Sequence, residues 1–454
     1  MNEKFSKRTK TFYQELCKKD NLIIAWHSVY ANMKKSESNH IRVAAKRYNE
    51  LENKNINQLS QQLKKMSFKF NARGIPLEKK DKNYRPVVSF DTNGRIVQRC
   101  ILNILQNHIH IQPYLNCPSS YGGIKRKGIS DAIEAICKSF KKENYTYVIT
   151  TDIKSFFTKI KKDYVLNKLA VFCEDKNFLN LINASIDIEI DNIKTIEDNY
   201  PSLLEKYKYT EEGVPQGSCL SPLFGNIYLY ELDNFMNSIP NIAYFRYIDD
   251  VVIIGANYKT VIRAFKNNLL PKLASLGLNA YTLNENNTKA YIGQIKNGFD
   301  YLGVTIYENV IKPNNKSFTN IKKEINELLA DALCSETLEK KNLYEILNII
   351  SKKIKGWGNH YWFCNASREI KNLDKNIDQK ISKFIKKYQA KLSKLTDASI
   401  RNELGISRFS NCTNSNGKLP IMKKIKQETT IRTDKKLLIK NTTLQKKNNS
   451  KTPF

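Results

Sequence analysis

The sequence predicts an α+β fold with helices toward both ends of the chain and apolar strands between them. Runs rich in β-branched and aromatic residues, at 145–153, 243–248 and 251–254, have the composition of buried strands. Apolar residues recur at helical spacing within residues 1–70 and again within 318–395. The strand runs therefore indicate a central sheet, and the helical runs indicate an N-terminal extension and a helical C-terminal region.

Length and charge limit the class of protein. The chain has 454 residues, more than one compact core usually holds, so two or three domains are expected. Lys and Arg number 75 against 44 Asp and Glu, and the resulting net charge of +31 indicates a polyanionic partner. Nucleic acid is the first candidate for that partner, and an anionic membrane surface is the second.

The composition also argues against several other classes. No apolar run approaches the roughly 20 residues that span a bilayer, and residues 1–19 are polar and basic, unlike a secretory signal. The nine cysteines are scattered singly without Cys-x-x-Cys pairs, which argues against a structural zinc site. We therefore expect reduced thiols and a cytoplasmic protein.

Residues 73–90 predict two short strands joined by a basic turn. Lys79, Lys80, Lys82 and Arg85 crowd this turn. A cluster of cations at the tip of a β-ribbon is a suitable place to bind a triphosphate, because each cation offsets phosphate charge. Taken alone, the feature is equally consistent with a charged surface loop.

A Gly-rich, basic loop at residues 119–128 follows a predicted helix over 94–111. The loop leads into another helix from about Ser130, whose side chain can cap it. Small residues together with Lys and Arg suit the backbone of a nucleic acid. The loop residues expected to contact nucleic acid are Tyr121, Gly122, Lys125 and Arg126.

Carboxylates follow or separate the strongest predicted strands. Asp249 and Asp250 fall between two apolar runs, so they are predicted at the tip of a hairpin. Adjacent charges at the end of a buried strand repel each other unless a cation or a basic partner offsets them. A hard divalent cation is the expected partner, with Asp152 at the end of the 145–151 run as a third ligand. The alternative interpretation is a solvated turn.

Two further loops complete the candidate site. Residues 213–229 combine Gly, Pro and Ser before a helix, and small residues there let another molecule approach the backbone closely. Gln216 lies between Pro and Gly in this loop, so its position is rigidly fixed. Residues 298–306 predict a tight hairpin with an aromatic tip, and the basic helical region beyond it includes Trp357.

Taken in order along residues 70–310, these motifs resemble those of reverse transcriptases. The matching stretches are Arg85-Pro86, Asp152 with Phe156-Phe157, Pro215-Gln216-Gly217 with Ser221-Pro222, Tyr247-Ile248-Asp249-Asp250, Thr288-Lys289 and Phe299-Asp300-Tyr301-Leu302-Gly303. The loop near residue 120 and the Gly-Trp-Gly-Asn-His-Tyr segment near 360 are most similar to the bacterial group II intron type. No endonuclease module with paired Cys or His follows the helical region, a layout similar to defence-associated, abortive-infection-type reverse transcriptases.

The resemblance implies a right-hand polymerase. Its fingers and palm, an antiparallel sheet plus helices, would occupy residues 71–310, and an α-helical thumb would occupy 311–405. A helical extension over 1–70 would precede them. The tail over 406–454 is rich in Lys, Asn, Thr and Ser, so we expect it to be flexible or to order only on a partner. The implied partners are an RNA template, expected to be a structured noncoding RNA, deoxynucleoside triphosphates and a DNA product, without a membrane.

The resemblance also assigns the chemistry. Two Mg²⁺ ions, or Mn²⁺ in their place, would be held by the carboxylates of Asp152, Asp249 and Asp250 and by the Ile153 carbonyl. Lys289 would protonate the leaving pyrophosphate. The residues implied to bind nucleotide are Lys79, Arg85, Phe157, which would exclude a 2′-hydroxyl, and Gln216. Tyr301 in the hairpin and Trp357 in the thumb would contact nucleic acid.

Three functions stay open on the sequence. The first is an RNA-directed DNA polymerase, including one that extends without a template or primes on a protein tyrosine. The second is a maturase-like RNA-binding protein that braces an intron, although the intact Asp152, Asp249 and Asp250 argue against this as its only role. The third is an RNA-directed RNA polymerase, which Phe157 argues against. Antiphage defence and retrotransposition are both compatible with the first function.

Overall fold

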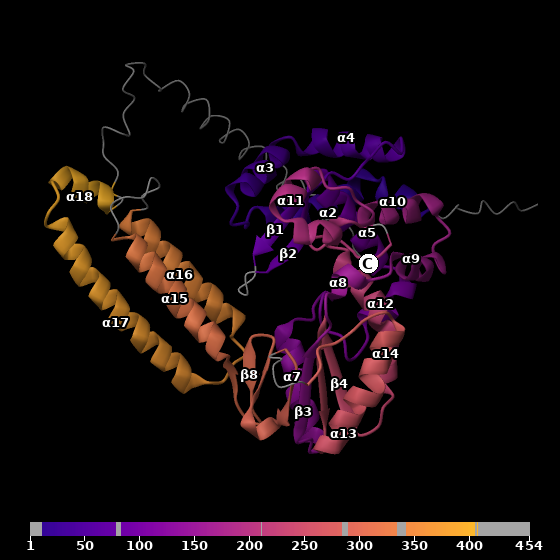
Figure 1. Cartoon of the computed structure of the whole chain (residues 1–454). Helices are drawn as coiled ribbons and strands as arrows, with labels where there is room; N and C mark the ends of the chain where they lie inside the picture. The colour runs from indigo at the N-terminus through magenta and orange to yellow at the C-terminus, as the bar shows by residue number, and fades with distance from the viewer. Residues whose placement is uncertain are drawn as a thin grey trace, which may run out of the picture. The chain divides into compact units, whose positions relative to one another are not determined.

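The computed structural model describes residues 11–78, 83–209, 211–283, 289–333, 342–404 and 406. These residues belong to two units (Figure 1). The first unit comprises Met1–Asn314 with Phe363–Asn365, and the second comprises Asn315–Trp362 with Ala366–Phe454. Among the helices so described, none is long and apolar enough to cross a membrane.

A four-stranded antiparallel sheet organises the first unit. Its strands, in the order β4-β5-β3-β6 across the sheet, are β4 (Ile242–Tyr247), β5 (Asp250–Gly255), β3 (Tyr147–Asp152) and β6 (Tyr291–Gln294). The two central strands are rich in the β-branched residues Val, Ile and Thr, and β5 is buried along its whole length after its first residue. The predicted strands at 145–153 and 243–255 are thereby confirmed, because β-branched residues pack well in a sheet covered by helices.

The first unit also contains two smaller antiparallel sheets. One pairs β1 (Ala72–Glu78) with β2 (Tyr84–Phe90). The other joins β7 (Phe299–Tyr301), β8 (Val304–Ile306) and β9 (Ile311–Pro313). The first sheet confirms the predicted pair of strands around a basic turn, and β7 with β8 confirms the predicted hairpin.

Helices cover the sheets and fill the rest of the first unit. In chain order they are α1 (Phe12–Leu16), α2 (Lys19–Met33), α3 (Asn39–Glu50), α4 (Glu52–Lys64), α5 (Thr92–Gln106), α6 (Gln112–Leu115), α7 (Ile129–Glu143), α8 (Phe156–Lys159), α9 (Lys162–Ala170), α10 (Lys176–Ile186), α11 (Ile193–Asn199), α12 (Ser221–Asn237), α13 (Tyr258–Arg263) and α14 (Leu270–Ser275). Short 3₁₀ helices span Ile109–Ile111, Pro201–Tyr207 and Ile295–Asn297, and a π-helical stretch spans Ala264–Leu269. Together with the antiparallel sheets they confirm the α+β fold class.

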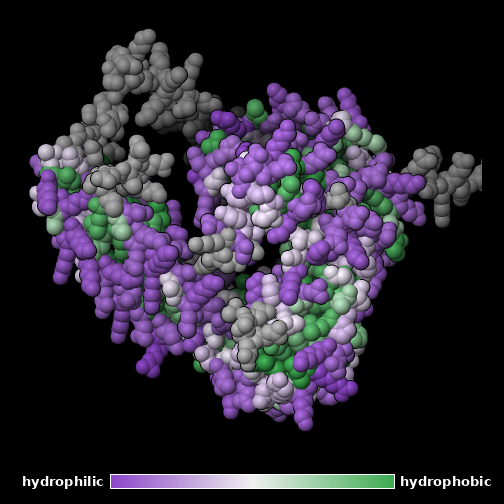
Figure 2. Space-filling view, in the orientation of Figure 1, coloured by the Kyte–Doolittle hydropathy of each residue, from purple (hydrophilic) through white to green (hydrophobic). Residues whose placement is uncertain are grey.

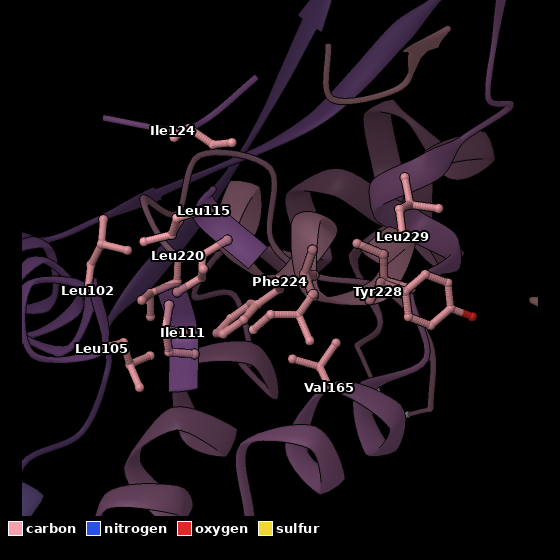
Figure 3. Close-up of a cluster of buried hydrophobic side chains, with 14 of the residues drawn as sticks. Leu102, Leu105, Ile111, Leu115, Ile124, Val165, Leu220, Phe224, Tyr228 and Leu229 are labelled. Atoms are coloured by element: carbon pink, nitrogen blue, oxygen red, sulfur yellow. The ribbon is translucent and has the colours of Figure 1, made fainter. Parts of the chain in front are cut away.

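Helix α12 lies in the middle of the main hydrophobic core. Figure 3 shows Phe224 and Tyr228 of α12, and Leu220 just before it, among side chains from α5, α6 and α9. Most of α12 is buried because apolar or small residues occur all around it, as expected of a helix enclosed by other elements. The core therefore holds α12 firmly within the first unit.

The second unit consists of helices. They are α15 (Asn315–Asp331), α16 (Leu343–His360), α17 (Ser367–Leu392) and α18 (Asp397–Glu403). The three long helices pack along one apolar seam, and each contributes residues spaced about one helical turn apart. Hydrophilic side chains, many of them lysines, cover most of the face seen in Figure 2.

Candidate active site

Three carboxylates meet at one end of the four-stranded sheet. Asp152 is the last residue of β3 and Asp250 is the first residue of β5, and the strand register places them directly opposite each other. Asp249 precedes Asp250 in the turn from β4, as the predicted hairpin requires. The backbone carbonyl of Asp249 accepts a hydrogen bond from the Ile153 amide, with an N–O distance of 3.0 Å. Sheet pairing therefore gathers all three carboxylates.

Burial and mutual repulsion raise the pKa of two of these carboxyl groups. Burial, followed by the nearby Asp152 carboxylate, raises the pKa of Asp249 to about 6, whereas Arg85 and Lys289 act to lower it. Burial, followed by Asp249 and Asp152, raises the pKa of Asp250 to about 7. Because a cation offsets this kind of repulsion, this end of the sheet is suited to binding positive charge.

Lys289 is a cation that the structure brings to the carboxylates. Its Nζ lies 3.6 Å from Oδ2 of Asp152 and donates a hydrogen bond to the Tyr281 hydroxyl at 3.1 Å. Burial acts to lower the pKa of Lys289, but the contacts with Tyr281 and Asp152 outweigh burial and raise it. The other predicted lysine, Lys79, lies outside the described residues.

The donor atoms at this end of the sheet have the chemistry of a hard-metal site. As the side chains are arranged, no three His, Cys, Asp or Glu residues of the described ranges stand close enough to hold one ion. The available donors are nevertheless the carboxylate oxygens of Asp152, Asp249 and Asp250 and the carbonyl of Ile153, which are the ligand type that Mg²⁺ takes. Mn²⁺ shares this preference for oxygen. The residues present therefore fit either ion.

Strand β2 carries Arg85 and also holds the loop that contains Gln216. Arg85 is exposed on β2, and its charge acts on Asp249. The Gln216 carbonyl accepts a hydrogen bond from the Val88 amide at 2.6 Å, which attaches its loop to β2. Gly217 has a φ of +123°, and a Cβ there would lie 2.2 Å from the Val88 oxygen. Only glycine permits this approach, so it fixes the position of Gln216.

Close packing against α12 places Phe156 and Phe157. Phe156 is 2% exposed, and a Cβ on Gly225 of α12 would lie 2.8 Å from the Phe156 Cε1 atom. Phe157 is half-buried, and its carbonyl accepts a hydrogen bond from the Val214 amide at 2.8 Å. Phe157 is therefore attached to the loop that carries Gln216.

The loop at residues 119–128 is exposed only in part. Lys125 and Arg126 are exposed and line an open cavity of about 1520 Å³ that extends to α1 and α2. Tyr121 is half-buried. Gly122 is buried, and its carbonyl accepts a hydrogen bond from a side chain of α12. Of the four predicted contacts, Lys125 and Arg126 are thus the two open to solvent.

Tyr301 and Trp357 both take part in packing. Tyr301 is 5% exposed, and its hydroxyl donates a hydrogen bond to the Asp250 carbonyl at 3.3 Å. Because this ring is buried beside β5, the nucleic-acid contact predicted for Tyr301 is not open to a ligand in this structure. Trp357 belongs to the second unit, where its half-buried ring packs against Phe318 and Tyr361.

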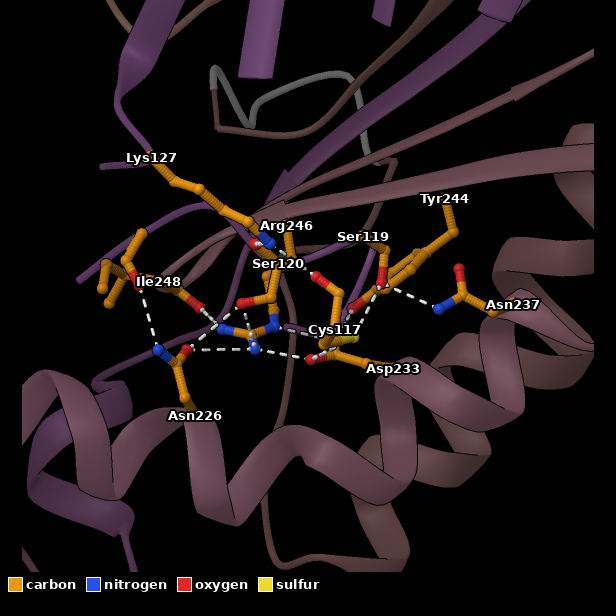
Figure 4. A network of polar contacts seen from close by, with 11 residues as sticks. Cys117, Ser119, Ser120, Lys127, Asn226, Asp233, Asn237, Tyr244, Arg246 and Ile248 are labelled. Carbon is orange, nitrogen blue, oxygen red and sulfur yellow. Dashed lines mark hydrogen bonds and ion pairs between the residues drawn. The ribbon is translucent and has the colours of Figure 1, made fainter. Parts of the chain in front are cut away.

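A charged residue that no motif predicts contacts Ile248, in the turn that also carries Asp249 (Figure 4). Arg246 of β4 is completely buried, and its Nη2 lies 2.6 Å from Oδ2 of Asp233 in α12. Burial acts to lower the pKa of Arg246, and the Asp233 carboxylate outweighs burial and raises it. A cation between Phe245 and Tyr247 in an otherwise apolar strand is the sequence feature that indicates such a buried pair.

Two families match the chain in succession. Residues 77–306 match "Reverse transcriptase (RNA-dependent DNA polymerase)", and residues 316–398 match "Group II intron, maturase-specific domain". The chain is 31% identical over 185 residues to the "Uncharacterized 91 kDa protein in cob intron" of Schizosaccharomyces pombe. It is 27% identical over 231 residues to the "Group II intron-encoded protein LtrA" of Lactococcus lactis subsp. cremoris. These alignments cover 40% and 49% of this chain and 21% and 35% of the two relatives.

A solved structure of apo telomerase from Candida tropicalis is also similar, with a TM-score of 0.40 and 15% identity over 70% of this chain and 62% of that chain. The chain thus spans only part of the length of these relatives. The reverse transcriptase match extends over more than half of the chain and includes Asp152, Asp249 and Asp250. On this evidence the chain belongs to the reverse transcriptase (RNA-dependent DNA polymerase) family.

Proposed function

We propose that the chain is an RNA-directed DNA polymerase that adds deoxynucleotides by nucleotidyl transfer with two divalent metal ions. The observation that carries this proposal is the pairing of Asp152 with Asp250 on adjacent strands, with Asp249 in the adjoining turn. Membership of the reverse transcriptase family supports the same reaction.

The carboxylates of Asp152, Asp249 and Asp250 and the carbonyl of Ile153 would hold the metal ions. When bound, two Mg²⁺ ions, or Mn²⁺ in their place, lower the pKa of the primer hydroxyl and offset charge on the triphosphate. Repulsion among the three carboxylates supports this assignment, because a cation removes it. The sheet register supplies these ligands from two central strands, which is a rigid support for a site.

Four side chains around the carboxylates would act on the nucleotide. Lys289, ion-paired with Asp152, would donate a proton to the leaving pyrophosphate. Arg85, together with Lys79, would neutralise phosphate charge. Gln216 would line the nucleotide pocket, and the ring of Phe157 would exclude a 2′-hydroxyl, so that deoxynucleotides are favoured.

We also assign RNA binding to the second unit and to both ends of the chain. The maturase-specific match at 316–398 supports this role, and the exposed side of α17 carries many lysines, whose phosphate contacts give salt-dependent affinity. Fingers and palm would lie in 71–310 and the thumb in 311–405. Residues 1–70 and 406–454 would help to bind a structured noncoding RNA that serves as template.

A primer-extension assay tests the proposed activity. Purified protein receives a DNA-primed RNA template, labelled deoxynucleotides and Mg²⁺. We expect DNA complementary to the template from the wild type and none from the Asp249→Asn/Asp250→Asn variant, while the exposed control Glu308→Gln stays active. DNA unrelated to the template would instead indicate untemplated or protein-primed synthesis. Equal use of ribonucleotides would indicate an RNA polymerase.

The maturase-specific match favours a second candidate, a protein that braces an intron RNA without making DNA. Sequencing the RNA that copurifies from the native host separates the two. One specific RNA bound equally by wild type and by the double carboxylate variant, with no DNA from either, would support the second candidate. The antiphage role stays a prediction, and phage challenge of cells carrying either protein tests it.

A further inference from the structure

Arg246 lies at the centre of a buried polar network behind the turn that carries Asp249 (Figure 4). Its side chain is 0% exposed and donates hydrogen bonds from all three guanidinium nitrogens. The acceptors are Asp233 Oδ1 from Nε at 2.8 Å, the Ile248 carbonyl from Nη1 at 2.8 Å, and Ser120 Oγ, Asn226 Oδ1 and Asp233 Oδ2 from Nη2 at 2.9, 3.2 and 2.6 Å. The position of the guanidinium is therefore fixed from several directions.

The turn that Arg246 contacts is strained. Strands β4 and β5 are joined by two residues, Ile248 and Asp249, and Ile248 has a φ of +60°. A two-residue hairpin with positive φ at its first turn position favours glycine there. A β-branched residue in this region of φ is an outlier, and such strain persists only where surrounding contacts hold the backbone.

Two contacts hold this turn. The first is the hydrogen bond from Arg246 Nη1 to the Ile248 carbonyl. The second is Gly122, which packs so closely that a Cβ there would lie 2.5 Å from the Ile248 nitrogen. Asn226 joins the two contacts, because its Nδ2 donates to the Gly122 carbonyl at 3.0 Å while its Oδ1 accepts from Arg246.

Helix α12 anchors the network. Asn226 and Asp233 are two helical turns apart, so they lie on the same face of α12, and both are buried. Asp233 also accepts a hydrogen bond from the Tyr244 hydroxyl at 3.0 Å. The Arg246 amide donates to the Ser119 carbonyl at 2.8 Å, which attaches the 119–123 loop to β4. The turn is thus held against a helix that the core itself fixes.

Stability alone does not account for this arrangement. A buried ion pair contributes little more than apolar packing of the same volume, because both charges lose their hydration. A lysine would preserve the charge opposite Asp233 but lacks the planar fork that bonds a carboxylate and a carbonyl together. What arginine adds is the bond to the Ile248 carbonyl.

We propose that Arg246 is a positioning residue for the metal-binding carboxylates: it holds the strained Ile248 turn so that Asp249 stays beside Asp152. The inference rests on the proposed function, since it assumes that these carboxylates bind metal. Residues that support metal ligands in this way alter metal affinity or activity by about 10- to 100-fold when they are replaced.

The test compares Arg246→Lys with Tyr244→Phe. The control removes a hydrogen bond to the same Asp233 on the same strand but leaves the turn untouched. Mn²⁺ binding without nucleic acid is measured by electron paramagnetic resonance, and the Mg²⁺ half-saturation of DNA synthesis is measured separately. We expect Arg246→Lys to weaken both by about 10-fold or more with an unchanged KM for template–primer, and Tyr244→Phe to match the wild type.

Two further variants separate positioning from folding. Gly122→Ala pushes on the turn without changing any charge, so we expect it to weaken Mn²⁺ binding in the same way. Ile248→Gly removes the strain, so added to Arg246→Lys it is expected to restore Mn²⁺ affinity. Rescue of this kind would not follow if Arg246 only stabilised the fold.

Wild-type Mn²⁺ affinity in folded Arg246→Lys would overturn the inference. If that variant does not fold, Gly122→Ala decides, and normal Mn²⁺ binding by Gly122→Ala would overturn it as well. Failure of the proposed function looks different. A wild type that binds Mn²⁺ but makes no DNA would remove the polymerase proposal and leave the comparison of metal affinities intact.

Discussion

At the residue scale, Phe156 and Phe157 show how two adjacent phenylalanines come to have different tasks. Phe156 is buried against Gly225 in the core, whereas Phe157 is half-buried beside the loop of Gln216. Sequence identifies the pair but gives both residues the same apolar character. The close approach of Gly225 to Phe156 and the hydrogen bond from the Val214 amide to the Phe157 carbonyl distinguish the two rings in the structure.

Phe157→Ala is expected to relax the choice of sugar. Without the ring, no side chain that we assign to the nucleotide site would block a 2′-hydroxyl. The preference for deoxynucleotides over ribonucleotides should therefore fall by about 10- to 100-fold, which is the range over which apolar pockets reject a hydroxyl. Competing incorporation of the two nucleotides measures the ratio. Phe156→Leu is the matched control, and the small cavity that it leaves in the core should lower stability with the ratio unchanged. An unchanged ratio in Phe157→Ala would refute the role given to that ring.

The carboxylates predict an unusual pH dependence for the metal-free protein. The pKa of Asp249 and Asp250 in the folded chain, about 6 and about 7, lies above the value of about 3.9 for an unfolded aspartate. The folded state then binds more protons, so stability falls as pH rises from about 4 to about 7. We expect the Tm without metal to drop over this range.

Differential scanning fluorimetry in a chelator measures this drop in Tm. Asp250→Asn should flatten the dependence, while Glu308→Gln, an exposed control, should not. Adding Mg²⁺ above pH 7 should raise the Tm of the wild type more than that of Asp250→Asn. Identical curves for wild type and Asp250→Asn would contradict the raised pKa of Asp250.

At the scale of elements, the sequence predicted the strands and the hairpin that depend on neighbouring residues. Strands β3 and β5 follow from their β-branched runs, and the hairpin with Asp249 and Asp250 follows from charge between two apolar segments. The position of Asp152 at the end of its strand made it the candidate third ligand, but its pairing opposite Asp250 depends on the sheet register, which composition does not reveal. Arg246 belongs to no chemical motif, and only the packing of β4 on α12 shows that its partner is Asp233. The nucleic-acid contact predicted for Tyr301 came from the resemblance, and an aromatic hairpin does not reveal which of its faces is buried.

The contact between the 213–220 loop and β2 gives a prediction for that loop. In Gly217→Ala, the added Cβ would meet the Val88 oxygen and the φ of +123° would be strained, so Gln216 should move. We expect kcat/KM for deoxynucleotides to fall by about 10- to 100-fold, since small displacements in a nucleotide site are costly. Steady-state primer extension provides the measurement.

Gly356→Ala is the matched glycine control for that loop. It lies in α16 with nothing within 4 Å of the added Cβ, so it should stabilise the helix by about 0.5–1 kcal/mol and leave extension unchanged. Comparable losses in Gly217→Ala and Gly356→Ala would show that the loop contact does not set the nucleotide site.

At the scale of the whole molecule, the carboxylates and the lysine-rich α17 belong to different units. This division predicts that RNA affinity and chemistry can be altered separately. Replacing the exposed Lys383, Lys386 and Lys387 together by Gln should weaken RNA binding and reduce the slope of log affinity against log salt by about 0.7–0.9 for each phosphate that is no longer neutralised. The rate of extension at saturating template–primer should not change.

Filter binding at several salt concentrations measures that slope. The comparison is the double variant Lys194→Gln/Lys206→Gln, which replaces two exposed lysines of the first unit. A slope that falls equally in both variants would mean that RNA responds to overall charge and not to α17.

The Arg246–Asp233 pair also restricts how this sequence can change over generations. Replacing either residue alone by a neutral one would leave a buried charge without its partner, at about 3–5 kcal/mol, out of the roughly 5–15 kcal/mol that hold a typical domain together. Drift at one position is therefore blocked until the other changes as well. The residues lie 13 positions apart on a helix and a strand, so those two elements can diverge here only in concert. Surface residues around the turn that carries Asp249 can then vary during evolution, while Arg246 and Asp233 are retained or replaced together.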